Sequence, residues 1–194
     1  MVTISNVKVY DLKESIIACR NSMRTKPVQK PSLDEYDKSL ERAIKLCDHT
    51  SKAGEDNFLK GIRVSFDIIY PQYFSMELQR YHFIDIISSS SKMHRLKIMG
   101  TDPESFNKYV DPRIKDILYE KVKDYNANPS YGALIEMISN CPMGFQLFMR
   151  ISTNYACLKN IYKQRHNHRL QEDWGAFCDM IRKLPLADKF LTNI

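Results

Sequence analysis

Residues 62–69, "IRVSFDII", constrain the fold of this chain more than any other stretch, because apolar and polar side chains alternate from Ile62 to Ile68. Such a period of two is typical of a β-strand with one buried face. The residues that share the predicted buried face are Ile62, Val64, Phe66 and Ile68. Pro71 follows after Tyr70, and proline is tolerated in the first turn of a helix. We therefore expect a helix over residues 71–83, entered directly from this strand.

The rest of the chain mixes further strand patterns with a larger number of helical ones. Strands are expected at residues 2–10 and 145–153. Helices are expected at residues 12–23, 32–54, 112–125, 131–140, 154–163 and 169–184. No linker is long enough to split the 194 residues. The sequence therefore predicts an α+β fold with one domain over residues 1–194.

Local signals fix the ends of the helix expected at residues 32–54. Ser32 with Glu35 three residues later forms a capping-box pattern, and Gly54 marks the expected end. In the last helix, Trp174, Phe177 and Ile181 recur at helical spacing. We interpret these three side chains as a core-facing stripe and not as part of a site.

Composition excludes several classes of protein. Cysteine occurs five times, an odd number, and no Cys-x-x-Cys pair is present, which argues against a disulfide framework and a zinc ribbon. The first residues lack the apolar segment of a secretory signal. No window approaches 18 consecutive apolar residues, so no membrane span is expected. A reducing, cytoplasmic setting follows as the expectation.

The formal net charge is +6, which suits a partner that carries phosphate. The basic residues are spread along the chain, and no standard nucleic-acid-binding motif is present. We therefore expect a nucleotide and no nucleic acid as partner. A basic surface with no specific partner is the alternative.

A run of four serines, residues 88–91, lies between two groups of basic residues. Arg80 and His82 precede the run, and the basic segment 92–95, "KMHR", follows it. Hydroxyls, backbone amides and cations that converge on one loop can hold a phosphate, because each supplies a donor and none adds negative charge. The alternative is a solvated loop.

A second polar group lies in residues 153–174, "TNYACLKNIYKQRHNHRLQEDW". Asn154, Asn160 and Arg165 run along one expected helix and past its end. The alternative for Arg165 is a helix cap or a pair with Glu172 or Asp173. The histidines of the "HNH" segment, two residues apart, do not share a helix face, so no metal site is predicted.

These segments, in this order, resemble the flavin-dependent thymidylate synthases, whose signature is RHRxxSxNExSxRY. The corresponding text here is "RYHFIDIISSSSKM". Arg80 falls on the first arginine, Ser90 on the later serine, and Lys92 stands where the last arginine is expected. Tyr81 and His82 replace the histidine and second arginine of the signature.

Two further differences and two further matches define the resemblance. Ile87 and Ser88 replace the Asn-Glu pair of the signature, and Glu77 takes a position that is often glutamine. "SIIACRNSM" is similar to the early AARxS segment, and "TNYACLKNIYKQR" with "LQED" is similar to NxRSLxNFLxLR…AQxEI. The family also places an arginine between the middle helix and the "TN" segment. The candidate for it here is Arg150.

The resemblance implies a mixed, largely antiparallel sheet flanked by helices, and an enzyme that converts dUMP to dTMP. Such enzymes use FAD, with NADPH as reductant and methylenetetrahydrofolate as carbon donor. They form homotetramers with shared active sites, and none of the five cysteines needs a catalytic role. The alternatives are a flavoenzyme for another pyrimidine nucleotide and a noncatalytic nucleotide-binding or flavin-binding homologue.

The same resemblance assigns the candidate site residues. The catalytic candidates are Ser90 and Arg165. The substrate-binding candidates are Glu77, Arg80, Ser88, Ser89, Ser90, Ser91, Lys92 and Arg165. The cofactor-binding candidates are Ser22, Arg80, Tyr81, His82, Asn154 and Asn160. No metal ligand is expected.

Overall fold

The computed structural model describes residues 1–47 and 55–193 of the chain. Its strands are β1 (Thr3–Tyr10), β2 (Arg63–Pro71), β3 (Asp85–Ser89) and β4 (Gln146–Asn154). Its α-helices are α1 (Leu12–Ala18), α2 (Leu33–Cys47), α3 (Gln72–Leu78), α4 (Lys92–Met99), α5 (Pro112–Ala127), α6 (Tyr131–Ser139), α7 (Tyr155–Arg165), α8 (Gln171–Arg182) and α9 (Ala187–Phe190). Short 3-10 turns are η1 (Asn21–Met23), η2 (Asn57–Lys60) and η3 (Pro103–Ser105). The predicted α+β fold is confirmed.

The four strands form one sheet in the order β1-β2-β4-β3, and every neighbouring pair is antiparallel. β2 and β4 pair along their full length, from Arg63 opposite Asn154 to Pro71 opposite Gln146. The expectation of a largely antiparallel sheet is therefore confirmed. The two strands with the cleanest alternation, β2 and β4, occupy the middle of the sheet, where both edges of a strand find hydrogen-bond partners.

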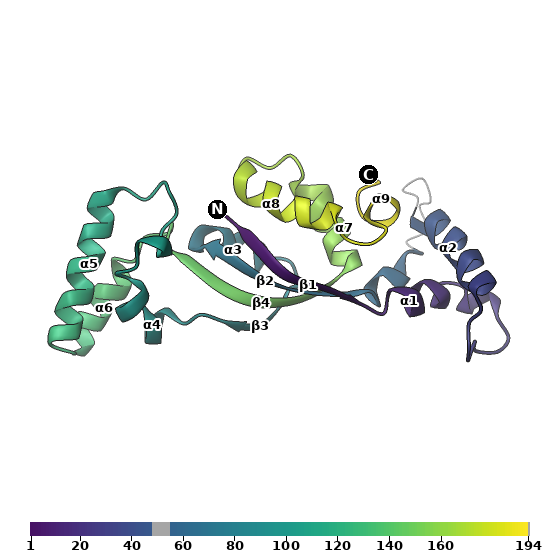
Figure 1. Cartoon of the computed structure of the whole chain (residues 1–194), viewed down its shortest axis with the longest axis horizontal. Coiled ribbons are helices and arrows are strands. Elements are labelled where there is room, and N and C mark those ends of the chain that lie inside the picture. Colours follow the sequence, from purple (N-terminus) through teal and green to yellow (C-terminus); the bar gives the residue numbers. More distant parts are fainter. Residues whose placement is uncertain (48–54, 194) are drawn as a thin grey trace.

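Helices cover one face of the sheet and leave the other bare (Figure 1). α3, α7 and α8 lie over one face, α1 and α2 lie beyond one end of the strands, and α4, α5 and α6 lie beyond the other. The alternation in β2 follows this arrangement, since Val64, Phe66 and Ile68 are fully buried whereas Ile69 is 46% exposed. On β4, Phe148 is 56% exposed. An antiparallel sheet tolerates such a one-sided cover.

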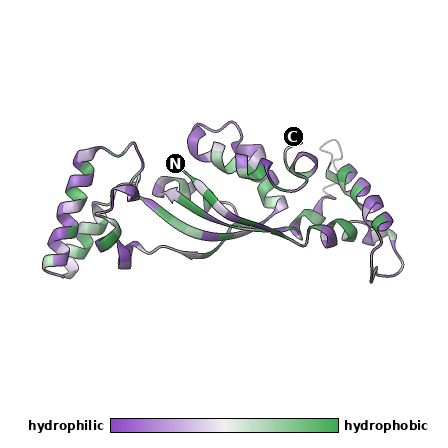
Figure 2. Ribbon diagram, viewed as in Figure 1, coloured by the Kyte–Doolittle hydropathy of each residue, from purple (hydrophilic) through white to green (hydrophobic). Residues whose placement is uncertain are grey.

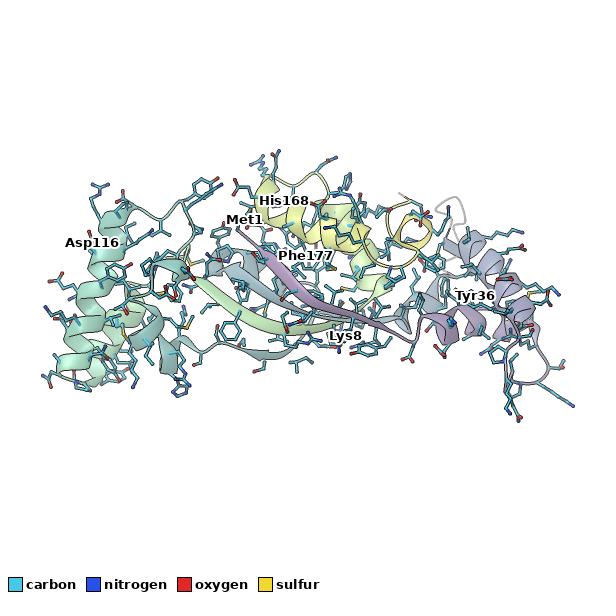
Figure 3. All side chains as sticks on the ribbon, in the orientation of Figure 1. Met1, Lys8, Tyr36, Asp116, His168 and Phe177 are labelled. Carbon is cyan, nitrogen blue, oxygen red and sulfur yellow. The ribbon has the colours of Figure 1, made fainter. Side chains whose placement is uncertain are left out.

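The core lies between the sheet and α8. Trp174, Phe177 and Ile181 are all fully buried, which confirms the predicted stripe. The Trp174 ring lies 4.6 Å from that of Phe74 on α3, and Phe177 lies against Phe66 of β2 at 5.7 Å between ring centroids. Figure 3 shows Phe177 between α8 and the strands. Each such side chain contributes about 1.5–3 kcal/mol when it leaves water, so this contact holds α3, α8 and the sheet together.

Several elements differ from the prediction. The helix expected over residues 12–23 ends at Ala18 and is followed by η1, and that expected over 71–83 ends at Leu78. The serine run is not only a loop, because Ser88 and Ser89 belong to β3. α4 was not predicted.

At the start of α2, the expected capping bond is present, since the Glu35 amide donates to the Ser32 hydroxyl at 3.2 Å. The expected end of this helix at Gly54 lies outside the described residues. Within 1–47 and 55–193, no helix is long and apolar enough to cross a membrane. Figure 2 shows that apolar residues concentrate on the strands, whereas the end helices α2 and α5 carry many hydrophilic ones.

Candidate functional site

A hollow of about 970 Å³ lies against the bare sheet face, next to the serine run. We name it the serine groove. Its lining residues are Ser5, Asp67, Ile68, Ile69, Ser88, Ser89, Ser90, Ser91, His94, Arg95, Ile98, Met99, Phe148, Met149 and Arg150. The floor comes from β2 and β4, and one wall comes from β3 and α4. The structure thus brings all four serines to one open groove, although they lie on a strand end and a helix start.

Ser90 continues the pairing of β3 with β4 beyond the end of β3. Its amide donates to the Phe148 carbonyl at 2.9 Å, and its Oγ accepts from the Phe148 amide at 3.1 Å. The Oγ is therefore occupied as an acceptor, while the hydroxyl hydrogen stays able to donate. Ser91 is the residue that precedes the first turn of α4.

Lys92 turns away from the serine groove. Its Nζ donates to the Gln72 side-chain oxygen, and the Gln72 amide group donates onward to the Pro142 carbonyl at 2.9 Å. Lys92 is not among the residues that line the groove. The sequence placed it with the serines as a substrate-binding residue, but its ammonium group instead joins α4 to the start of α3.

Arg150, the candidate for the unassigned arginine, lies in the floor of the groove opposite Ser88. Its Nη1 donates to Asp67 Oδ1 at 3.0 Å and to the Asn6 carbonyl at 3.1 Å. The Asn6 side-chain amide donates to Asp67 Oδ2 at 2.6 Å. The hydrogen bond from Asn6, and next that from Arg150, holds the pKa of Asp67 below its ordinary value. Asp67 therefore stays ionised and neutralises the charge of Arg150.

A second hollow, of about 370 Å³, lies where the end of α3 approaches α7. We name it the arginine pocket, and its lining residues are Arg80, Tyr81, His82, Asn160, Gln164 and Arg165. No carboxylate lines it, and the side chains of Arg80 and His82 make no hydrogen bond to the described residues. Four of the predicted cofactor-binding residues and the catalytic candidate Arg165 therefore meet at one place.

Arg165 is held in place by three contacts. Its Nη1 donates to Glu77 Oε2 at 3.0 Å, its Nε donates to the Tyr81 hydroxyl at 2.7 Å, and its guanidinium lies 4.7 Å from the centre of the Trp174 ring. The alternative partners were Glu172 and Asp173, and both are engaged elsewhere. Glu172 accepts from Lys108, and Asp173 accepts from the Val2 amide and the Tyr73 hydroxyl. The pairing alternative named for Arg165 is therefore wrong, and its partner is Glu77.

The remaining predicted cofactor residues differ in accessibility. Asn160 is exposed, and its side-chain oxygen accepts from Gln164 at 3.1 Å. Asn154 is only 4% exposed, and its side-chain oxygen caps α7 by accepting from the Cys157 amide at 2.9 Å. Ser22 is exposed in η1, beside α1 and α2, and lines neither hollow. The structure does not bring Ser22 together with the other candidates within one chain.

The histidines of the "HNH" segment have local partners. His166 stacks on Tyr162, and His168 Nε2 lies 3.6 Å from Glu77 Oε2. Figure 3 shows His168 near the start of α8, above the sheet. Across the described part of the chain, no group of three or more His, Cys, Asp or Glu side chains is arranged to hold a metal ion.

Several residues that line the two hollows were assigned no role from the sequence, among them Gln164 and Phe148, and Arg95 was named only as part of the basic segment 92–95. Arg95 and Gln164 each lie one helical turn from a predicted residue, so their spacing from Lys92 and Asn160 was the available signal. Phe148 gave no such signal, because an aromatic residue in a strand pattern is ordinarily buried.

The fold is that of a known class, the flavin-dependent thymidylate synthase fold. The chain is similar to the crystal structure of the flavin-dependent thymidylate synthase ThyX from Helicobacter pylori complexed with FAD and dUMP, with a TM-score of 0.68 and 15% identity over 98% of this chain and 97% of that chain. A second structure of Helicobacter pylori ThyX with FAD and dUMP has a TM-score of 0.63 and 13% identity, over 98% and 96%. No protein-family model matches the sequence, and no curated protein sequence matches it either. At these identities the likeness establishes the shared fold.

Proposed function

We propose that this protein is a flavin-dependent thymidylate synthase-like enzyme that reductively methylates dUMP to dTMP with methylenetetrahydrofolate, FAD and NADPH. The observation that carries the proposal is a fold likeness that spans almost the whole of both chains, to structures that hold FAD and dUMP. The order of the resembling segments along this sequence supports it independently, because the segments that contain Arg80, the serine run and Arg165 line the two hollows.

The residues of the arginine pocket fit FAD. A dinucleotide needs cations and hydrogen-bond donors for its diphosphate and amide groups for the flavin edge. This pocket offers the Arg80 guanidinium and the His82 ring for the first and Asn160 for the second. FAD, when bound, supplies the redox chemistry, and the protein supplies binding and orientation. In this proposal Arg80, Tyr81, His82 and Asn160 contact the cofactor.

Two other cofactor candidates act differently in this proposal. Asn154 fixes the start of α7, the helix that carries Asn160 and Arg165, so it positions these residues from within the protein. Ser22 lines neither hollow of its own chain. In this proposal it therefore contacts a cofactor that is bound mainly by another chain.

The serine groove is the proposed nucleotide site. The hydroxyls of Ser88, Ser89 and Ser91 offer donors to the phosphate and sugar, and Phe148 offers an apolar surface for the base. Ser90 holds the wall of the groove to β4 and donates its hydroxyl hydrogen to the nucleotide. Arg165 orients the uracil from the arginine pocket of a neighbouring chain, and Glu77 holds Arg165 in position.

The proposed assembly is a homotetramer with shared active sites. Both hollows are open, and they lie at separate places on one chain, so a closed site requires surfaces from more than one chain. The bare sheet face is the proposed contact surface, where a neighbouring chain covers the nucleotide held against Phe148 together with the exposed side chain of Ile69. A cytoplasmic setting suits the five free thiols.

A noncatalytic homologue that binds nucleotide or flavin is the second candidate. One observation favours it, the ion pair between Glu77 and Arg165. This pair neutralises the charge of an arginine that the reaction is expected to use. A flavoenzyme for another pyrimidine nucleotide shares the same sites.

A product assay separates these functions. The full chain is incubated with FAD, NADPH, methylenetetrahydrofolate and dUMP, and nucleotides are separated by chromatography. We expect dTMP to accumulate only when all four are present. Binding of FAD and dUMP without dTMP favours the noncatalytic homologue, and binding of neither compound overturns the proposal.

A further inference from the structure

We propose that Arg95, and not Lys92, recognises the phosphate of the nucleotide in the serine groove. The identity of the nucleotide rests on the proposed function. The assignment of Arg95 rests on the contacts that each cation around the groove makes.

Lys92 is already engaged. Its ammonium group donates to the Gln72 side chain, which is itself fixed by the Pro142 carbonyl and by a 3.2 Å contact with Cys141 Sγ. A ligand phosphate in the groove would have to draw Lys92 out of this chain of hydrogen bonds. Lys92 therefore serves as the link between α4 and α3.

Arg95 is exposed and lines the groove beside Ser88, Ser89 and Ser91. Lys92 and Arg95 are three residues apart on α4, so their side chains leave the helix in neighbouring but different directions. Within residues 1–47 and 55–193, the Arg95 guanidinium has no hydrogen bond or ion pair. Its positive charge is therefore available to a ligand.

The other cation of the groove is already neutralised. Arg150 pairs with Asp67 at 3.0 Å, and the Asn6 amide completes the contacts of that carboxylate. Asp67 is the one acid among the described residues that line the groove. A phosphate near α4 thus meets an uncompensated guanidinium and several hydroxyls, and it meets no unpaired negative charge.

The chemistry of the guanidinium matches this role. Its planar fork can donate to two phosphate oxygens at once, which an ammonium group does not reproduce. The serine hydroxyls can donate to the remaining oxygens. The predicted ligand class is a phosphomonoester of a nucleoside, with the base lying toward Phe148 and Ile69 on the bare sheet face.

Calorimetric titration of dUMP and of deoxyuridine, which lacks the phosphate, tests this inference on the full chain with FAD present. We expect Arg95→Ala to weaken dUMP binding roughly 10- to 100-fold and to leave deoxyuridine binding unchanged, because it removes two charge-assisted hydrogen bonds. Arg95→Lys restores only part of the affinity. Lys92→Ala weakens dUMP binding less than Arg95→Ala.

The matched control is Lys97→Ala, which removes an exposed cation of the same helix that does not line the groove. We expect it to bind dUMP as the wild type does. If the wild type binds dUMP and Arg95→Ala binds it equally well, the inference is overturned and the proposed function stands. A larger effect of Lys92→Ala than of Arg95→Ala also overturns it. A wild-type protein that binds no dUMP overturns both.

Discussion

Arg165 Nη1 lies 3.0 Å from Glu77 Oε2, although 88 residues separate the two in sequence. The same carboxylate oxygen accepts from the Trp174 indole at 2.7 Å. One oxygen of Glu77 therefore joins α3, α7 and α8. The pair is partly shielded from water, since the Arg165 side chain is 15% exposed and the Glu77 side chain 31%.

Arg165→Ala should lower stability as well as substrate affinity. The change leaves Glu77 without its cation and uncovers the Trp174 ring, which we expect to cost about 2 kcal/mol. In a chain of this size that corresponds to a melting temperature lower by roughly 4–8 °C. Arg165→Lys should recover little, because an ammonium group cannot donate to both Glu77 and Tyr81 in this geometry.

Thermal unfolding of these variants beside Arg169→Ala provides the control. Arg169 is an exposed arginine four residues further on, and its side chain makes no contact of this kind with the described residues. Equal melting temperatures for Arg165→Ala and Arg169→Ala would contradict the structural role of the Arg165–Glu77 pair.

Ser90→Ala should weaken the attachment of the residues after β3 to β4. It removes the Oγ acceptor of the Phe148 amide, whose net contribution is about 1 kcal/mol. Amide hydrogen exchange at Phe148 should accelerate roughly fivefold. Ser89→Ala is the control, because the Ser89 hydroxyl is exposed and bonds to none of the described residues. Unchanged exchange at Phe148 in Ser90→Ala would show that its hydroxyl does not hold β3 to β4.

The elements that could be predicted from the sequence are those whose burial leaves a periodic pattern in their own residues. The alternation in β2 and the stripe of Trp174, Phe177 and Ile181 both record burial, and all these side chains are indeed buried. β3 was missed because all five of its residues are exposed, so no apolar alternation marks it. It is a strand only because it pairs with β4, which lies about sixty residues further along the chain.

For the candidate site, the sequence predicted which residues belong to it but not the contacts that their side chains make. The resemblance assigned Arg80 and Arg165 to the substrate and Arg80 and Asn160 to the cofactor, and the structure places these three residues around one hollow. It did not reveal that Lys92 faces Gln72, because that direction depends on how α4 packs against α3. Nor does any local pattern report the partner of Arg165, since pairs so distant in sequence are set by the packing of whole helices.

Stability near α2 should depend on acid pH through Glu35. Its carboxylate accepts from Arg24 and lies 3.1 Å from Arg20. The hydrogen bond from Arg24, and next the charge of Arg20, holds the pKa of Glu35 below its ordinary value of 4.5. Because the folded-state pKa is lowered, this contribution is present above the unfolded-state pKa and is lost as the pH falls through the folded-state pKa.

The measurement compares the wild type with Glu35→Gln. The wild type should melt at the higher temperature at neutral pH, and the difference should shrink as the pH falls below about 4.5. A difference that stays constant down to strongly acidic pH would show that the carboxylate charge is not its cause.

Phe148→Glu should prevent assembly if the bare sheet face is a contact between chains. Phe148 lies directly opposite Ile69, and a buried unpaired carboxylate at this point would carry a high desolvation cost. Sedimentation should show smaller particles for Phe148→Glu, and Leu33→Glu, at an exposed position on α2, should assemble as the wild type does. A monomeric wild type, or an intact Phe148→Glu assembly, would count against this surface.

The proposed function requires that this chain bind FAD and dUMP. Its most direct test is a titration of the purified wild-type protein with FAD, followed by dUMP, with the visible absorption of the oxidised flavin recorded after gel filtration. We predict that FAD stays with the oligomer at one equivalent per chain and that dUMP shifts the flavin spectrum. A protein that leaves the column colourless after excess FAD would contradict the proposed function.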